Sequence, residues 1–446
     1  MRLALLTFVA AIRAVSCAGE STSPPLPAVP PSAPSDPAPS KGDTAKGAPP
    51  PAETPATDVA QGSVTGPTDA QADVRAANAL SMNLFRKARK GSPNVMLSGT
   101  SLRRALGLAY LGARGETARE MAASLELPDA TKTAALAKAE GLAWQEAKGK
   151  AELVVADRVW TDKGLALKDD FVKLAEGALG GDPVARVDFA RAPDPARKAV
   201  NAWVAEKTSN KIVDLLPSGS VDAATRLIVT NAIYFKGRWT SPFSKNATKD
   251  ETFRAQGGKS VTTPMMHATE SHRFGQASGV KLLEMRYDNS DVAMLVALPD
   301  DPNGLTKLED ALAPDVFDSW TRALAPQRVA ITLPKFTFKS GGSMNAPLQE
   351  LGMKIPFSNK ADFGGIAEPA AGERLQISQV AHQTYVAVDE NGTEATAATG
   401  IVMHTTSLPM GPIVEFKADR PFLFFIYDAK RGRVLFIGRV ADPKAS

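Results

Sequence analysis

Residues 227–239 read LIVTNAIYFKGRW, and this stretch says the most about how the chain folds. Its first nine residues, 227–235, are an almost uninterrupted apolar run in which Thr230 and Asn231 are the polar members. A run of this length without an alternating polar face is typical of a strand that is buried on both sides within a large sheet. The sequence therefore predicts a central strand here.

Helices and further strands surround this stretch. Apolar residues at helical spacing begin at Val74, a short buried strand is expected at 94–98, and helices are expected at 101–112 and 200–212. Strand-like runs follow at 281–298, 329–338, 375–388, 413–417 and 422–439. No proline-rich break and no repeat separates the two sets. The sequence thus predicts one large α+β domain over residues 73–446.

Composition and charge narrow the classes of partner. Of the 446 residues, 43% are hydrophobic, which is enough to build a sizeable core. The 52 basic and 48 acidic residues leave a net charge of +4, an excess too small to indicate nucleic acid as a partner. The densest basic run, 86–90, is interpreted as a solvated helix end, with a polyanion site as the alternative.

The first 17 residues have the features of an export signal. Arg2 precedes the apolar run 3–12, which is too short to span a bilayer as a mature helix. The run leads to Cys17, the only cysteine, so an intramolecular disulfide is excluded. The segment is similar to the bacterial lipoprotein signal, in which such a cysteine carries lipid. Arg13 and Ala14 depart from that signal, and ordinary signal-peptide cleavage near Cys17 is the alternative.

Residues 18–72 are rich in proline, alanine, serine, threonine and glycine. Such a segment cannot bury enough apolar surface to offset the entropy lost on ordering, so we expect a disordered tether. Together with the signal, this composition predicts an exported chain at the cell envelope or outside the cell, with a membrane anchor if Cys17 is lipidated.

Six stretches of the domain, taken in order, resemble the serpin family. The first is 231–239 with Pro242 and Phe243, and the others are 333–336, 351–366, 377–395, 420–424 and 436–440. The resemblance implies an α+β serpin fold: a large central β-sheet, two smaller sheets, surrounding helices and an exposed reactive-centre loop. Serpins usually carry an aromatic residue in place of Leu97 and proline in place of Gly99, so we expect that corner of the structure to be looser.

The segment that should carry function is recognisable without the family. Residues 392–400, GTEATAATG, are small, almost uncharged and free of proline. A strand that must slide between two others needs all three properties, because bulky or charged inward side chains would clash or lose solvation and proline would remove a donor. With a period of two, Thr393 falls on one face and Glu394 on the other, where it can stay in water. The alternative is a plain surface loop, which the serpin-like residues 388–390 just before it argue against.

What the resemblance implies for this segment is a suicide mechanism against serine proteases. A protease takes the loop as its substrate and forms an acyl-enzyme with it. The freed loop then inserts as a new strand of the central sheet, which is a known form of strand addition, and carries the bound protease with it before deacylation. The family's spacing places the reactive bond between Thr406 and Ser407, and Ser407 and Met403 are further candidates for the residue before the bond. A small β-branched residue there suits an elastase-like or subtilisin-like enzyme and not trypsin, whose pocket requires Arg or Lys. The residues expected to form the hinge of this loop are Glu390, Gly392, Thr393, Glu394, Ala395, Thr396, Ala397, Ala398 and Thr399.

The resemblance also assigns residues that support opening of the sheet. Glu390 and Lys335 match a family salt bridge where the strand enters, and Trp239 packs at the same place. The polar cluster lower in the sheet is matched by Ser98, Ser101, Asn231 and His382. An isolated buried histidine is most often structural, but the spacing of His382 ahead of Gly392 favours the cluster.

Other functions find less support in the sequence. None of the four histidines stands in a metal-binding pattern such as HExxH, and no Gly-x-Ser-x-Gly elbow is present, so an enzyme is not expected. A serpin fold without inhibition is the stronger alternative, although its hinge would carry bulky, charged or proline residues. Inhibition of cysteine proteases also stays open. We expect a monomer that needs no cofactor and no metal.

Overall fold

The apolar stretch that starts at Leu227 forms β5 (Leu227–Arg238), which is buried over its first nine residues. In this computed structural model the described residues are 70–89, 91–146, 151–368, 374–394 and 412–445, and all of them belong to one compact unit. The predicted signal peptide with Cys17 and residues 18–69 of the predicted tether lie outside them, as do the reactive bond and residues 395–399 of the hinge. Residues 70–72, the end of the predicted tether, are helical and begin α1 (Ala70–Ala88).

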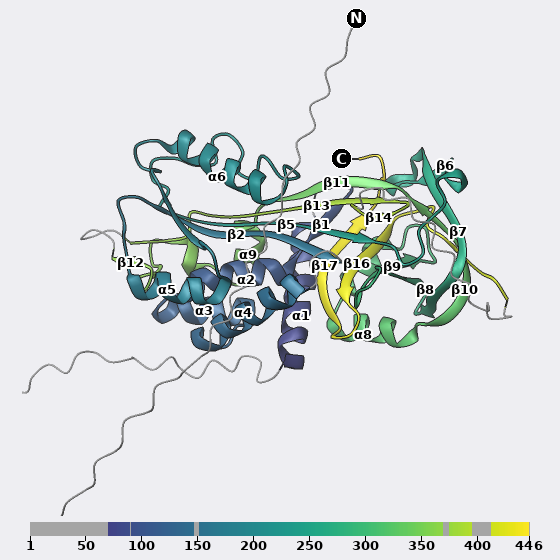
Figure 1. The fold of residues 1–446 in the computed structure, drawn as a ribbon, viewed down its shortest axis with the longest axis horizontal. Helices are drawn as coiled ribbons and strands as arrows, with labels where there is room; N and C mark the ends of the chain where they lie inside the picture. Colours follow the sequence, from purple (N-terminus) through teal and green to yellow (C-terminus); the bar gives the residue numbers. More distant parts are fainter. Residues whose placement is uncertain (1–69, 90, 147–150, 369–373, 395–411, 446) are drawn as a thin grey trace, which may run out of the picture. The chain divides into compact units, whose positions relative to one another are not determined.

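Helices and strands are interleaved as an α+β fold requires (Figure 1). The α-helices of the described residues are α1 (Ala70–Ala88), α2 (Gly99–Tyr110), α3 (Gly115–Leu125), α4 (Ala130–Glu146), α5 (Asp169–Leu179), α6 (Pro193–Lys207), α7 (Leu305–Asp310), α8 (Pro314–Ala323) and α9 (Asn345–Glu350). The strands besides β5 are β1 (Val95–Leu97), β2 (Glu152–Asp162), β3 (Ala166–Leu167), β4 (Val184–Val187), β6 (Lys249–Arg254), β7 (Ser260–Ala277), β8 (Val280–Arg286), β9 (Val292–Pro299), β10 (Ala325–Pro334), β11 (Phe336–Ser343), β12 (Ala367–Glu368), β13 (Gln379–Asp389), β14 (Gly392–Thr393), β15 (Val414–Lys417), β16 (Phe422–Asp428) and β17 (Arg433–Val440).

The central sheet has the strand order β11-β13-β14-β5-β2-β4. Over most of their length β13 and β5 pair directly and in parallel, from Gln379 opposite Ile228 to Tyr385 opposite Tyr234. Beyond that point the short strand β14 lies between them and pairs antiparallel with both. The sheet therefore forks at one end, and the start of the hinge fills the fork.

The remaining strands form a nine-stranded sheet and the small pair β12-β3. The long strand β7 pairs with β6 over residues 260–265, with β10 over residues 265–274 and with β8 over residues 273–277. The two smaller sheets that the fold implies are thus joined through a shared strand. The expected α+β arrangement is confirmed.

Three apolar cores hold these layers together. One lies between the helices α1–α5 and both sheets, and a second lies between the central sheet and the nine-stranded sheet. The third joins α6 to the opposite face of the central sheet, where Val200 and Val204 meet Trp160 and Ile228. Figure 1 shows α6 alone on its side of the sheet and α2–α5 on the other.

The corner at Gly99 is closely packed. Ser98 caps α2, because its hydroxyl accepts a hydrogen bond from the backbone N–H of Ser101 at 3.1 Å. A Cβ atom added at Gly99 would overlap Ser81 of α1. The expectation of a looser corner is therefore wrong, because glycine here allows two helices to approach closely.

Candidate functional site

The first hinge residues are built into the central sheet. Gly392 has φ +154°, and a Cβ atom there would overlap the carbonyl oxygen of Gly237, so only glycine fits without a shift. Thr393 is fully buried, and its hydroxyl lies 2.7 Å from the Tyr287 hydroxyl. The predicted inward face of the hinge thus starts with Thr393.

A stacked pair of aromatic side chains contacts the start of the hinge. The ring of Tyr287 stacks on Trp239 with centroids 4.5 Å apart, and the indole N–H of Trp239 donates to the carbonyl of Asp389 at 3.1 Å. Trp239 also donates its backbone N–H to the carbonyl of Asn391. The structure therefore places Trp239 where the hinge leaves β13.

The predicted salt bridge of Glu390 is present. Its carboxylate lies 2.8 Å from Nζ of Lys335 and accepts a second hydrogen bond, also 2.8 Å, from the Thr248 hydroxyl. Burial raises the pKa of Glu390, but the hydrogen bonds from Lys335 and Thr248 outweigh it, so the pKa lies below its ordinary value. Glu390 is thus ionised where the hinge begins.

Glu394 is not left in water as expected. It lies on the face opposite Thr393, but its side chain is only 16% exposed, and Oε1 lies 2.9 Å from Nζ of Lys211. Its backbone N–H donates to the carbonyl of Ala387, and its φ of +48° is left-handed. The hydrogen bond to Glu394 raises the pKa of Lys211. Sequence reasoning missed Lys211, which stands in a connection without any motif.

The four predicted cluster residues come together beneath the fork. The backbone N–H of Ser98 donates to Nε2 of His382, and Nδ1 of His382 lies 2.6 Å from Oδ1 of Asn231. Asn231 in turn donates to the Ser101 hydroxyl at 2.6 Å. Burial lowers the pKa of His382 to about 4, so the ring is neutral at pH 7 and carries its proton on Nδ1.

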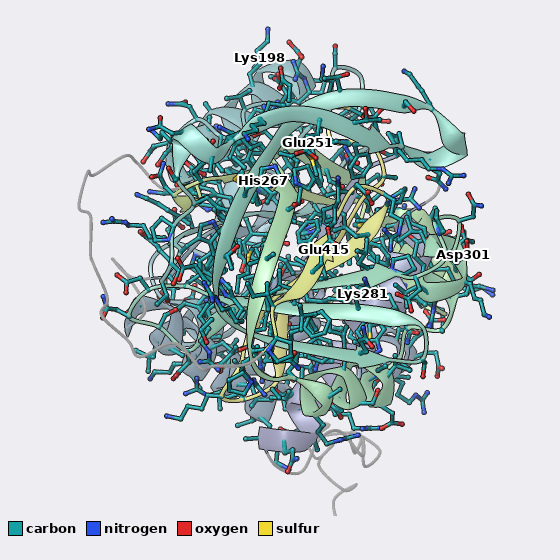
Figure 2. The ribbon with its side chains drawn as sticks, turned by 90° about the vertical axis from the view of Figure 1, so that its right-hand side faces the viewer. Lys198, Glu251, His267, Lys281, Asp301 and Glu415 are labelled. Carbon is teal, nitrogen blue, oxygen red and sulfur yellow. The ribbon has the colours of Figure 1, made fainter. Side chains whose placement is uncertain are left out.

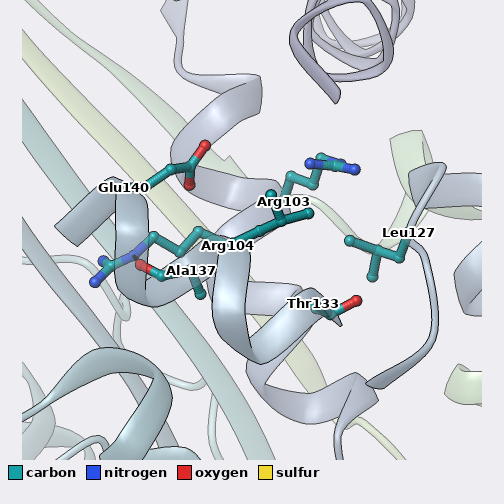
Figure 3. A pocket seen from close by; sticks show the side chains of 7 residues that line it. Arg103, Arg104, Leu127, Thr133, Ala137 and Glu140 are labelled. Atoms are coloured by element: carbon teal, nitrogen blue, oxygen red, sulfur yellow. Dashed lines mark hydrogen bonds between the residues drawn. The ribbon is translucent and has the colours of Figure 1, made fainter. Parts of the chain in front are cut away.

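A buried ion pair extends this cluster, and the sequence analysis did not identify it. Asn231 also donates to Asp157 of β2, whose carboxylate lies 2.8 Å from Arg104 of α2. Burial raises the pKa of Asp157 although the Arg104 guanidinium opposes that shift. Arg104 extends along α4 past Ala137 (Figure 3), beside a cavity of about 20 Å³ that has room for little more than a water molecule. Charged residues inside otherwise apolar elements were the signal available in the sequence.

An aromatic clamp fixes α6 to the outer face of the sheet. Trp203 of α6 meets Trp160 of β2 edge to face at 5.4 Å, and the Arg158 guanidinium lies 4.1 Å from the Trp203 ring. Arg158 is held by Asp182 at 2.7 Å. Any strand that enters between β13 and β5 would run beneath this helix.

The basic run at the end of α1 is occupied by intramolecular contacts. Arg86 donates to the carbonyl of Leu312, Lys87 pairs with Glu350, and Arg89 pairs with Glu309 at 2.7 Å. These contacts support the interpretation as a helix end over the polyanion alternative.

The described residues offer few features that would indicate a metal, membrane or catalytic site. Among the described residues, no three His, Cys, Asp or Glu side chains gather as metal ligands. Within the same ranges, no helix combines the length and apolar composition needed to cross a membrane. A shallow open groove of about 310 Å³ on the nine-stranded sheet is lined in part by His267, Thr332 and Glu415. Figure 2 labels His267 and Glu415 on this sheet. His267 there lies 2.8 Å from a carboxylate oxygen of Glu251 and 3.3 Å from the Thr332 hydroxyl.

Comparison with known proteins agrees with this geometry. The model of the family described as serpin (serine protease inhibitor) matches residues 75–443. The leukocyte elastase inhibitor of Bos taurus is 36% identical over 372 residues, which cover 81% of this chain and 97% of that protein. An uncharacterized serpin-like protein of Thermococcus kodakarensis is 34% identical over 380 residues, 83% of this chain and 86% of that one. The native stressed structure of Arabidopsis AtSerpin1 superposes with a TM-score of 0.74 at 29% identity, covering 84% of this chain and 99% of that chain. The chain belongs to the serpin family, a family of protease inhibitors and not of enzymes.

Proposed function

We propose that this protein inhibits serine proteases as a suicide substrate, with its reactive bond between Thr406 and Ser407. The observation that carries the proposal is the position of β14. Gly392 and Thr393 already pair with both β13 and β5, so the direction and register of a growing strand are defined before cleavage. By the alternation of side chains along a strand, the small residues Ala395, Ala397 and Thr399 would continue its inward face once inserted.

The fork explains why insertion would proceed. Below it, β13 and β5 run parallel, and a strand placed between them would pair antiparallel with both, as β14 does. Antiparallel pairs are slightly more stable per residue than parallel ones, so the exchange is favourable. Replacing one parallel pairing by two antiparallel ones would thus contribute to the free energy of insertion.

An elastase-like or subtilisin-like target fits the reactive bond. Thr406 suits a shallow pocket, and a relative at 36% identity is named an elastase inhibitor. The test is to incubate the full chain with pancreatic elastase, a subtilisin, trypsin and papain, and to look for a covalent band at the summed mass on denaturing gels. Cleavage by every enzyme without such a band would assign a serpin fold that does not inhibit. Trapping of papain alone would assign cysteine proteases as targets.

A matched variant separates trapping from cleavage. Thr399→Arg places a charge on the inward face and should convert the inhibitor into a substrate that is only cut. Thr396→Arg places the same charge on the outward face and should still trap protease. Equal trapping by both variants would contradict strand insertion.

We further propose that the chain is exported and that Cys17 is its lipid anchor. Metabolic labelling with a fatty-acid analogue should mark the wild-type chain and not Cys17→Ser. Export without label would leave ordinary signal-peptide cleavage as the explanation.

A further inference from the structure

Lys211 lies where the central sheet forks. Direct pairing of β5 with β13 ends at Tyr234 opposite Tyr385, and Thr393 lies between the two strands just beyond. Lys211 belongs to the connection after α6, and its Nζ lies 5.2 Å from the centre of the Tyr385 ring and 2.9 Å from Glu394. Tyr385 meets Tyr234 edge to face at 6.4 Å. One lysine thus contacts both the last directly paired position and the first hinge residue to leave the sheet.

The connection holds Lys211 in a fixed place. Ser209 and Asn210 have left-handed backbones, with φ of +49° and +60°. Asn210 donates its N–H to the carbonyl of Ala205, and Lys211 donates its own to the carbonyl of Thr208. The Thr208 hydroxyl accepts from the N–H of Ile212 and is fully buried. A lysine on such a turn loses less conformational freedom on pairing than one on an open loop.

The pair with Glu394 is compatible with both states of the hinge. In an extended strand, alternate side chains point to opposite faces. Thr393 points inward to Tyr287, so an extended Glu394 stays on the outer face, the side on which Lys211 lies. Insertion would change the left-handed backbone of Glu394 to an extended one and leave its charge beside the same partner. The left-handed backbone of Glu394 also marks where the native strand stops, since residues other than glycine seldom adopt it.

We propose that Lys211 is a positioning residue for inhibition: acting through Glu394, it holds the hinge at the fork so that insertion starts from a strand already in register. This inference rests on the proposed function. It predicts that Lys211 determines how the acyl-enzyme divides between insertion and release, and that it has little influence on the first cleavage of the loop.

The test compares two variants. Lys211→Met keeps an unbranched apolar side chain and removes the charge. The control is Lys207→Met on α6, because among the described contacts Lys207 forms an ion pair only with the neighbouring Glu206. With a protease that the wild type traps, Lys211→Met should raise the ratio of released to trapped acyl-enzyme by about two- to fivefold, as expected for loss of a partly exposed ion pair. This ratio is the number of inhibitor molecules consumed per trapped protease minus one. The rate of loop cleavage should stay unchanged. Lys207→Met should match the wild type. The double variant Lys211→Glu with Glu394→Lys keeps a pair of opposite charges and should recover most of the wild-type trapping.

A second measurement needs no protease. Hydrogen exchange of the Glu394 amide, which donates to Ala387, should be faster in Lys211→Met than in the wild type at equal thermal stability. Unchanged exchange, or faster exchange with an unchanged consumption of inhibitor, would overturn the role of Lys211. Failure of the wild type itself to trap any protease would refute the proposed function while the exchange data still report on the pair.

Discussion

Asn231 and His382 face each other across the boundary between β5 and β13, with Oδ1 of the first 2.6 Å from Nδ1 of the second. They belong to the two strands that loop insertion would separate. The other ring nitrogen of His382 accepts the backbone N–H of Ser98, so both nitrogens are used only while the ring is neutral. The proton state of one side chain is therefore linked to closure of the sheet.

Acid should weaken the native state through His382. Burial lowers its pKa from 6.5 to about 4, so between these values the unfolded chain binds a proton that the native chain does not. The contribution of this residue to the free energy of unfolding is complete above pH 6.5 and falls by about 1.4 kcal/mol per pH unit as the pH drops toward 4. Urea unfolding at pH 7 and pH 4.5 should show a smaller loss of stability for His382→Gln than for the wild type.

The control for this experiment is His267→Gln, which changes a partly exposed histidine on the nine-stranded sheet. The comparison separates the effect of the buried His382 ring from the effect of replacing any histidine. An unchanged dependence in His382→Gln would mean that the ring takes up a proton in the native sheet as readily as in the unfolded chain.

Removal of Arg104 alone should be strongly destabilising. Its guanidinium pairs with Asp157, and both side chains are at least nine-tenths buried. Arg104→Met leaves a buried carboxylate uncompensated, and breaking such a pair costs about 3–5 kcal/mol. Chemical denaturation measures this loss, and Arg104→Met with Asp157→Asn should recover most of it. If the double variant is as unstable as the single one, the cost comes from packing against α4 and not from the charge.

The hydroxyl pair of Thr393 and Tyr287 should show coupling. Tyr287→Phe leaves a fully buried threonine hydroxyl without the partner that lies 2.7 Å away, which costs about 1–3 kcal/mol. Thr393→Val in the same chain removes the unpaired group, so the double variant should be more stable than the sum of single effects predicts. Unfolding measurements on the four proteins complete the cycle, and simple additivity would place the hinge outside the sheet in solution.

Gly392→Ala should expel the hinge from the fork. The added Cβ atom would overlap the backbone at Gly237, and φ is +154°. The matched control is Gly258→Ala, also at positive φ (+82°) but with nothing within 4 Å of the added atom, so it reports the backbone cost alone. Because Trp239 donates to Asp389 and stacks on Tyr287, its fluorescence should change in Gly392→Ala and not in Gly258→Ala. Identical spectra for wild type and Gly392→Ala would show that the fork tolerates the methyl group.

The sequence predicted the strands of the fold better than it predicted the side-chain contacts of the candidate site. Apolar runs such as 227–235 located the strands, because a strand that is buried on both faces consists almost entirely of apolar residues. The hinge was visible in its composition, since a strand that must enter a sheet is restricted at every residue. Lys211 was not visible, because its role depends on a turn that brings residue 211 to residue 394. Asp157 and Tyr287 were missed for the same reason: each acts through a partner far away in the chain.

Specificity should follow residue 406. Thr406 suits a shallow pocket, whereas trypsin binds Arg or Lys through a buried carboxylate. We expect Thr406→Arg to be trapped by trypsin as a covalent complex, with the cleaved bond between residues 406 and 407 by mass spectrometry, and we expect it to lose trapping of elastase. Met403→Arg is the matched control, because it adds the same side chain three residues earlier and should be cut by trypsin there without efficient trapping. The contrast has a mechanical reason: the position of the bond sets how far the inserted strand carries the bound enzyme. If Met403→Arg traps trypsin as well as Thr406→Arg does, the length of loop before the bond does not govern trapping, and the assignment of the bond to Thr406 and Ser407 loses its basis.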